Sequence, residues 1–459
     1  MTQALAKNTD ASLERIAELS TLAEDLLRRA RVRGVDQCAL SLSESRGFNV
    51  AVRMGEVETV EYMRDRGLSL TVYFGGSESG VRKASASTAD LSPSGLEATL
   101  DQACAIARYT EADPMAGLAD AARMAPRVED FDRWHPWALE PDAAVALGIA
   151  CETAGRDADP RISNSEGASI NTGESISVYA NSHGFIGGER STSHSISCSL
   201  IAGQGEAMQR DDWYTAALAA SGLESPEQVG LRAAERTLSR LDPRHAPTGS
   251  FPVLFSAEMA RSLIGHLLGA VAGGAQYREA SFLLGAVGER IFPDWFALRE
   301  RPHLQRGFRS SSFDAEGVAT VESNLVTGGT LQRYLLDSYS ARKLGLATTG
   351  NAGGVANLDA SLGQDDLPAL LRGMGRGLYV TGLMGQGINP VTGDYSRGAS
   401  GFWIEGGQIA YPVDEVTVAG NLREMFLALE AVGCDVDPRS HIRTGSMLIG
   451  AMTVAGSAS

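Results

Sequence analysis

The amino-acid sequence predicts an α+β fold, with an N-terminal helix and antiparallel-sheet domain followed by a mostly β C-terminal domain that carries one long helix. Three observations predict it. Residues 12–33 place their apolar side chains on one helical stripe. From Cys38 to Phe74 apolar and polar residues alternate, which is typical of strands with one buried face. Beyond residue 250 the chain consists mainly of short strand-like segments separated by glycines.

Local signals predict the elements that follow. Arg46-Gly47 and Gly55-Glu56 are turn residues, so the first strands are expected to form an antiparallel meander. Ser92 suits an N-cap and Pro93 the first helical turn, so a second helix is expected to begin there. The later predicted elements are a connection at 113–141, a helix at 142–153, strands at 176–181 and 189–202, and a helix at 225–240.

A cluster of proline and glycine at 242–249 marks the predicted domain boundary. We therefore expect an N-terminal α+β domain at 1–245, with a possible sub-boundary near 113–141, and a C-terminal β-rich domain at 246–459. Two or three domains are expected because 459 residues exceed one typical hydrophobic core.

Charge and cysteine usage exclude several classes of function. The net charge is −16 and the 40 basic residues are scattered, so no nucleic-acid partner is expected. Five widely spaced cysteines without a CxxC pair argue against the common structural zinc sites and dithiol motifs. The N-terminus lacks the apolar core of a signal peptide, and the longest uncharged run, at 263–275, is too short to span a bilayer. We expect a cytoplasmic protein with no membrane contact.

The helix predicted after Phe255 has a narrow face of small residues. Ser256 suits its N-cap, and His266 lies on the neighbouring stripe. Small side chains recurring at helical spacing would let another backbone lie close. They are Ser262, Gly265, Gly269 and Ala272.

A glycine-rich run at 377–405 is the strongest candidate for a binding segment, because glycine weakens strands unless something must approach the backbone. One interpretation is a groove where an extended peptide adds as a strand. The candidate binding residues are Gly385, Gly387, Asp394, Tyr395, Ser396, Arg397 and Gly398. The alternative is that these glycines only turn corners in a curved sheet and that Asp394 and Arg397 form a structural pair. The residues leave both open.

Four stretches carry a resemblance to a known family. They are Ser340–Leu346, Thr349–Gly354, Gly377–Glu405 and Tyr411–Met425. Together they resemble the TldD/PmbA family of metallopeptidases and, within it, the PmbA (TldE) branch. The resemblance implies a TldD/PmbA-like α+β fold and a connection with peptide hydrolysis.

The zinc motif of that family is degenerate here. The catalytic branch carries His-Glu-x-x-x-His on a helix, where two imidazoles bind zinc and the glutamate polarises water. Aligning the shared glycine on Gly269 places Gly265, His266 and Ala270 at the three motif positions. The expected cysteine ligand near the C-terminus is matched by Thr444. A register shifted by one residue restores neither the base nor a second ligand, so we expect no metal and no confident catalytic residue in this chain.

The resemblance therefore implies a non-catalytic subunit that assembles with a zinc-bearing TldD-like homologue. The complex would degrade or process unfolded or small peptides, and zinc would belong to the partner subunit. Two alternatives remain open: an autonomous homodimeric metallopeptidase with an unconventional site around His266, and a peptide-binding regulator unconnected with proteolysis. Signatures of a P-loop, a dinucleotide-binding fold or a serine-nucleophile elbow are absent from the sequence.

Overall fold

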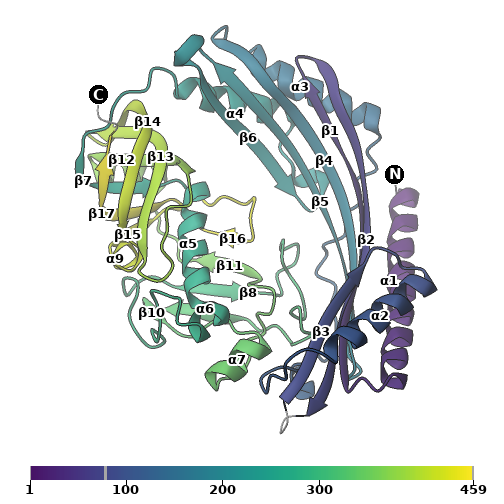
Figure 1. Ribbon diagram of the computed structural model, residues 1–459. Helices are drawn as coiled ribbons and strands as arrows, with labels where there is room; N and C mark the ends of the chain where they lie inside the picture. Colours follow the sequence, from purple (N-terminus) through teal and green to yellow (C-terminus); the bar gives the residue numbers. More distant parts are fainter. Residues whose placement is uncertain (1, 77–79, 457–459) are drawn as a thin grey trace.

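A strongly curved antiparallel sheet forms the N-terminal half of the molecule (Figure 1). The computed structural model describes residues 2–76 and 80–456. The six strands lie in the order β3-β2-β1-β4-β5-β6. Their bounds are Gln37–Arg53 (β1), Glu56–Gly76 (β2), Gly80–Thr88 (β3), Ile162–Asn181 (β4), Ile186–Ala202 (β5) and Gln209–Ala217 (β6).

Four helices cover the convex face of this sheet (Figure 1). They are α1 (Thr2–Val32), α2 (Pro93–Ala107), α3 (Pro141–Arg156) and α4 (Pro226–Ser239). The predicted N-cap at Ser92 is confirmed, since its side chain accepts a hydrogen bond from the Gly95 amide. Alternate strand residues such as Leu40, Leu42 and Val50 are fully buried beneath the helices. The predicted period-two pattern thus corresponds to one covered face and one concave open face.

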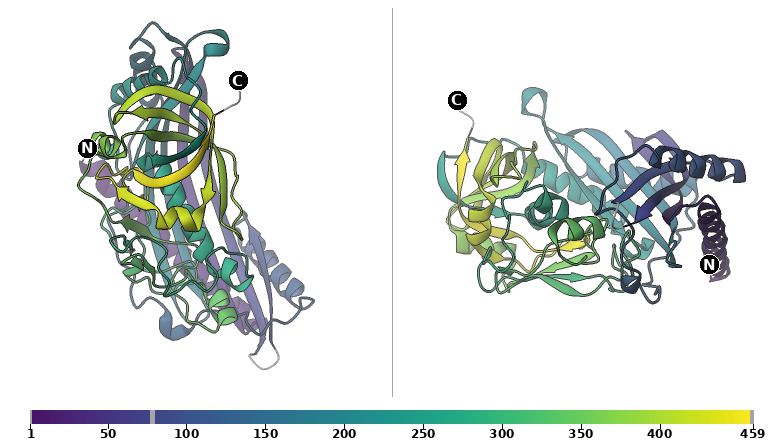
Figure 2. Two further views of the ribbon diagram at one scale, coloured as in Figure 1. Left: turned by 90° about the vertical axis from the view of Figure 1, so that its left-hand side faces the viewer. Right: turned by 60° about the horizontal axis from the view of Figure 1, so that its bottom comes forward.

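The C-terminal half lies against the concave face and is built around a small barrel (Figure 2). Its strands lie in the order β14-β13-β12-β7-β17-β15, and an additional β14–β17 pairing closes the ring. The bounds are Gly249–Phe255 (β7), Gly377–Met384 (β12), Asp394–Glu405 (β13), Gln408–Asn421 (β14), Leu429–Val432 (β15) and Met447–Ala455 (β17).

A second, five-stranded sheet and five helices complete this half. The strands are β8 (Leu298–Arg301), β9 (Ser323–Thr327), β10 (Thr330–Leu331), β11 (Asn357–Ala360) and β16 (Ile442–Arg443). The helices are α5 (Ala257–Val271), α6 (Gly273–Tyr277), α7 (Ser338–Leu344), α8 (Leu367–Met374) and α9 (Leu422–Leu427). The largest hydrophobic core lies between α5, the barrel and this sheet. The predicted α+β class is confirmed.

One predicted turn is wrong. Arg46-Gly47 lies inside β1, which runs unbroken from residue 37 to 53. Gly47 is instead needed for space, because a Cβ atom there would stand 2.2 Å from the Thr172 carbonyl oxygen of β4. Gly55, by contrast, sits in the β1–β2 turn with φ of +78°. Both glycines are required, for different reasons.

This difference yields a prediction for stability. Gly47→Ala should lower the free energy of unfolding by about 1–3 kcal/mol, because the new methyl group overlaps the backbone of β4. The matched control is Gly173→Ala in the directly opposed position, where the new Cβ would meet only the Ser193 carbonyl oxygen at 3.8 Å. Thermal unfolding of both variants checks this. Equal melting temperatures for the two variants would contradict the explanation that Gly47 is needed for space.

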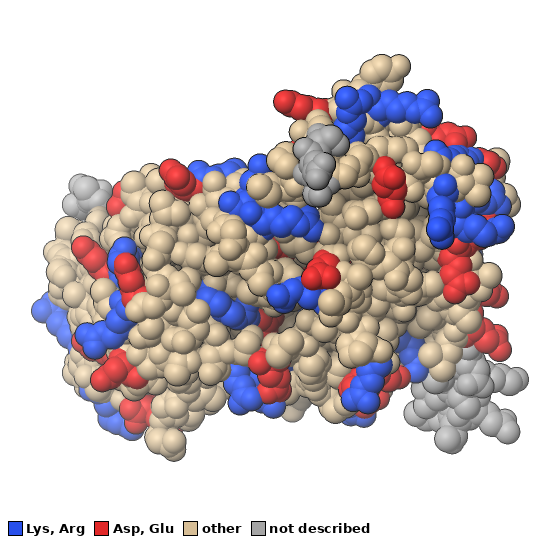
Figure 3. Space-filling model, turned by 90° about the horizontal axis from the view of Figure 1, so that it is seen from below, with Lys and Arg blue, Asp and Glu red and all other residues tan. Residues whose placement is uncertain are grey.

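Acidic and basic side chains are interspersed on the face seen from below, and no large area there carries a single sign (Figure 3). None of the helices in the described part of the chain is both long and apolar enough to cross a membrane.

Candidate functional site between the two halves

Helix α5 presents one bare edge. Its N-cap, Ser256, accepts a hydrogen bond from the Met259 amide at 3.3 Å, as its sequence suggests. Leu263 and Leu267 anchor the opposite side in the core. Gly265 and Gly269 are exposed, and a Cβ atom added at either would meet no atom within 4 Å. Within the described chain, the predicted close approach of another backbone to these glycines does not occur, so this edge of the helix is open.

His266 meets two of the predicted binding residues. Its ring lies edge-on to Tyr395, with 6.0 Å between the ring centroids. Burial lowers the pKa of His266, and the nearby guanidinium of Arg397 lowers it further. The structure therefore brings together His266, Tyr395 and Arg397 from α5 and β13.

Each of these three side chains carries a buried polar atom without a hydrogen-bond partner among the described residues. The atoms are His266 Nε2, Tyr395 Oη and Arg397 Nε. Tyr395 is 1% exposed, and burial raises its pKa to about 12 although Arg397 acts against the shift. Unpaired buried polar atoms cost free energy, so their convergence indicates a place where a polar group can be bound.

The other predicted residues point elsewhere. Asp394 accepts a hydrogen bond from Thr392 Oγ1 at 2.7 Å and from Asn421 Nδ2 at 3.3 Å. It is exposed and, like Ser396, alternates with Tyr395 and Arg397 along β13. The predicted alternative of an Asp394–Arg397 pair is therefore wrong, because the two side chains lie on opposite faces of one strand.

The glycines of this segment serve the chain's own backbone. Gly385 has φ of +77°, and a Cβ at Gly387 would stand 1.7 Å from the Ser396 carbonyl oxygen. At Gly398 a Cβ would stand 3.4 Å from the Met384 Cβ on the neighbouring strand. β13 pairs with β12 on one edge and with β14 on the other. A peptide therefore has no free edge at β13 to which it can add as a strand.

The residues at the degenerate motif positions do not fit zinc. Gly265 has no side chain, and Ala270 is buried with none that can ligate. Thr444 is fully buried, and its hydroxyl donates to the Gly445 carbonyl at 3.1 Å. Among the side chains that the structure describes, no three His, Cys, Asp or Glu residues gather in a way that could hold a metal ion. His266 alone cannot make a catalytic zinc site.

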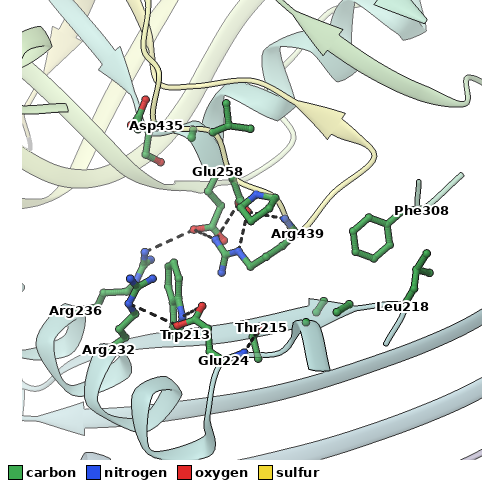
Figure 4. A pocket seen from close by; sticks show the side chains of 18 of the residues that line it. Trp213, Thr215, Leu218, Glu224, Arg232, Arg236, Glu258, Phe308, Asp435 and Arg439 are labelled. Atoms are coloured by element: carbon green, nitrogen blue, oxygen red, sulfur yellow. Dashed lines mark hydrogen bonds and ion pairs between the residues drawn. The ribbon is translucent and has the colours of Figure 1, made fainter. Parts of the chain in front are cut away.

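A cavity of about 670 Å³ opens at the N-terminal end of α5, between β6, α4 and the 435–439 loop (Figure 4). Trp213, Phe308 and Tyr379 supply apolar surface, and charged groups of both signs surround them. The charged residues are Glu224, Arg232, Arg236, Glu258, Arg306, Asp435, Asp437 and Arg439. A cavity that combines aromatic rings with charged side chains of both signs suits a ligand that has both apolar and polar groups.

Arg439 organises this cavity (Figure 4). Its guanidinium lies 4.0 Å from the Trp213 ring centroid and 4.1 Å from that of Tyr214. It donates to both carboxylate oxygens of Asp437, at 2.8 and 2.9 Å, and to the Tyr214 carbonyl at 2.9 Å. Sequence reasoning missed this cluster, because nothing local to Arg439 indicates a partner more than two hundred residues away.

A second cavity, of about 310 Å³, lies at the other end of α5. It is lined by Leu268 and Gly273 from the helical segment, by His441, and by Asn351 and Gly354 from the Thr349–Gly354 motif. Gly265 lies along α5 between Glu258, which lines the larger cavity, and Leu268, which lines the smaller one.

Models of one family match most of this chain. The PmbA/TldA metallopeptidase domain 1 matches residues 38–107, the central domain 134–241 and the C-terminal domain 248–456. Metalloprotease PmbA of Escherichia coli O157:H7 is 47% identical over 421 residues, which cover 92% of each chain. The chain belongs to the PmbA/TldD metallopeptidase family, in its PmbA branch.

Solved structures of the PmbA/TldD type share the fold. A protein of Bacteroides thetaiotaomicron described as a modulator of DNA gyrase aligns with a TM-score of 0.90 and 29% identity, over 96% of this chain and 99% of its own. TldE of Thermococcus kodakarensis aligns with a TM-score of 0.81 at 20% identity, over 95% of this chain and 100% of its own. The second likeness concerns the fold alone.

Removing Arg439 should loosen the junction between the halves. The side chains of Arg439 and Asp437 are each 6% exposed, so Arg439→Ala leaves a buried carboxylate partly unpaired. We expect a loss of about 3 kcal/mol, the lower end for a broken buried pair, because Arg261 still lies 3.0 Å from Asp437. Arg423→Ala, which breaks an exposed pair with Glu289, should cost only about 0–1 kcal/mol. Thermal unfolding of both variants measures the difference, and similar losses would refute it.

The His266 environment predicts a titration. The pKa of His266 should lie below the usual value of about 6.5, mainly through burial. Arg397→Gln should raise that pKa while leaving it below the usual value, since only the smaller of the two causes is removed. NMR titration of the imidazole checks both statements. A pKa unchanged by Arg397→Gln would show that the two groups do not interact.

Proposed function

We propose that this chain is a non-catalytic subunit of a cytoplasmic peptidase complex and assembles with a zinc-bearing TldD-like homologue. In this proposal the homologue cleaves the peptide bond, and the chain described here helps to enclose and hold unfolded or small peptides. The observation that carries the proposal is the state of α5, where the motif positions Gly265, His266 and Ala270 offer at most one zinc ligand.

The surroundings of α5 support a role in holding peptide. One cavity of about 670 Å³ lies at the N-terminal end of α5 and one of about 310 Å³ at the other end, and both are lined by polar side chains that can form hydrogen bonds with a peptide main chain. β6 is the last strand of its sheet, and Thr215 and Ala216 of that strand line the larger cavity. An edge strand can bind an extended peptide through main-chain hydrogen bonds without selecting its sequence. Arg439 already occupies the Tyr214 carbonyl of β6, so in this proposal the peptide meets the strand at Thr215 and Ala216 in the cavity wall.

His266 is what favours the second candidate function, an autonomous homodimeric metallopeptidase. Its Nε2 atom has no hydrogen-bond partner in the described chain, and burial lowers the pKa of His266, which favours the neutral imidazole that binds metals. The other ligands would have to come from a second subunit. The two candidates differ in whether the purified chain cleaves peptides by itself.

The test mixes this chain with a homologue that carries the intact His-Glu-x-x-x-His motif and follows cleavage of an unfolded peptide. We expect cleavage only in the mixture, and loss of it when the motif glutamate of the homologue is replaced by glutamine. His266→Ala in this chain should leave the rate within about twofold, since a non-catalytic residue contributes no transition-state stabilisation.

Each subunit alone is the control for that assay, together with the zinc content of this chain. Chelator-sensitive cleavage by this chain alone, with stoichiometric zinc that His266→Ala abolishes, would establish the second candidate instead. If neither the mixture nor either subunit alone cleaves the peptide, both candidate functions are refuted.

A further inference from the structure

Arg397 is a half-buried cation without a counter-charge in its surroundings. Its guanidinium forms no ion pair with a carboxylate of the described residues, although the net charge of the chain is −16. Its Nε atom is buried and has no hydrogen-bond partner there. A charge that leaves water without being paired is costly, so this guanidinium indicates a place that an anion can occupy.

Two further polar groups face the same place, and one of them can only complete its bonding with an acceptor or a donor from outside the described chain. Tyr395 is 1% exposed, and neither its hydroxyl nor His266 Nε2 has a hydrogen-bond partner among the described residues. Arg397 lies close enough to lower the pKa of His266 and to oppose the rise in the pKa of Tyr395. A guanidinium only donates and a phenol hydroxyl can donate, so a group that joins the two must accept hydrogen bonds.

The electrostatics of this site favour an anion over a metal ion. The positive charge of Arg397 disfavours a second positive charge on His266, and burial acts in the same direction. A cation bound at His266 Nε2 would meet the same repulsion, whereas a carboxylate would be attracted to the guanidinium. A carboxylate also has enough acceptor positions for several donors at once.

The open edge of α5 gives a ligand room beside these three groups. Gly265 and Gly269 flank His266 on the helix surface, and both are exposed. Glycine destabilises a helix interior relative to alanine. A Cβ added at either position would meet no atom within 4 Å, so packing within the described chain does not explain these two glycines. They leave space for the main chain of a ligand to lie against the helix.

Apolar side chains beside the polar groups indicate an organic anion. Ile388 forms an isolated bridge with Tyr395, and Met259 lies two helical turns before His266. Ile388 and Met259 are both half-buried against the main core. An inorganic anion would leave their apolar surface unused, whereas the last residue of a peptide carries a carboxylate and a side chain together.

We propose that His266, Tyr395 and Arg397 form a binding site for the C-terminal carboxylate of a peptide. The last residues of that peptide lie along the open edge at Gly265 and Gly269. The inference rests on the proposed function, because it states how this chain would hold a peptide that the complex encloses.

The larger cavity lies within reach of a peptide held in this way. Glu258 lines that cavity and stands before His266 on the same helix, at about 12 Å along the axis for 1.5 Å per residue. An extended peptide covers this length with about four residues. A short peptide can therefore end at Arg397 and still meet the cavity wall.

A comparison of peptide termini tests the site. One short unfolded peptide, labelled at its N-terminus, is made as the free acid, as the C-terminal amide, and as an amide whose last residue is aspartate. Fluorescence anisotropy measures the affinity of each for the full chain. The free acid should bind about ten- to a hundredfold more tightly than the plain amide, as charge-assisted hydrogen bonds require. The aspartate amide should bind like the plain amide, because its carboxylate is not at the end of the main chain.

Two variants locate the binding. Arg397→Gln should reduce the affinity for the free acid to that for the amide. Tyr395→Phe should weaken binding of the free acid by about fivefold and leave the amide unaffected. The melting temperature of Tyr395→Phe should not fall, because its hydroxyl gives up no hydrogen bond to a described residue. NMR signals of the His266 imidazole should move when the free acid is added and should stay in place with the amide.

The matched control is Arg423→Gln, which removes the same charge from an exposed position in the same half of the molecule. It should bind the free acid like the unmodified chain. Equal binding of acid and amide to the unmodified chain would overturn the proposal, as would a preference for the acid that persists in Arg397→Gln. An aspartate amide that binds as tightly as the free acid would refute the assignment to a chain terminus.

Failure of this site and failure of the proposed function give different results. A mixture with the zinc-bearing homologue that cleaves peptides, while the full chain binds acid and amide equally, would refute the carboxylate site alone. A mixture that cleaves nothing, while the chain still prefers the free acid and loses this preference in Arg397→Gln, would refute the proposed function alone.

Discussion

Three arginines that reach from one half of the molecule to main-chain carbonyls of the other determine how the halves sit. Arg133 donates to the Ser310 carbonyl at 2.7 Å, Arg342 to the Met115 carbonyl at 2.7 Å, and Arg439 to the Tyr214 carbonyl at 2.9 Å. Guanidinium groups suit this role, because one planar fork can satisfy several buried acceptors at once. The halves also meet at a buried apolar cluster of Ala125, Phe185 and Phe313, and the cavities beside α5 lie apart from it.

The long curved sheet supplies the other constraint. Its convex face is filled by helices, so its concave face and its two edges are what remain for function. The concave face receives the C-terminal half, and the β6 edge lies at the rim of the larger cavity. Only the first half of β2 is left without a covering element among the described residues.

The sequence predicts what depends on neighbours along the chain. Periodicity and caps located the helices that begin at Pro93, Pro226 and Ala257, because a cap acts within three residues of itself. The sequence does not show that Gly55 forms a turn whereas Gly47 lies inside a strand. The carbonyl oxygen that a side chain at Gly47 would strike belongs to a strand more than a hundred residues away.

In the candidate site, too, the sequence predicts only what depends on neighbouring residues in the chain. That Asp394 and Arg397 lie on opposite faces follows from the period of a strand, once the strand is known to begin at Asp394. The meeting of Tyr395 and Arg397 with His266 depends on how α5 crosses the barrel, and the Arg439–Trp213 contact depends on how the halves dock. Neither arrangement leaves a local pattern in the sequence.

The packing of α5 also decides what a His-Glu-x-x-x-His motif would require in this chain. The helix is held by Leu263, Ile264 and Leu267, which face the core and are 2% exposed or less. Gly265 lies on the bare edge, so a side chain can be lost or gained there without disturbing packing. Ala270 differs, because it is 3% exposed and an imidazole at that position would overfill the core. The absence of the motif is therefore built into the packing of this chain, and restoring it would require the core around Ala270 to be rebuilt as well as the ligands replaced.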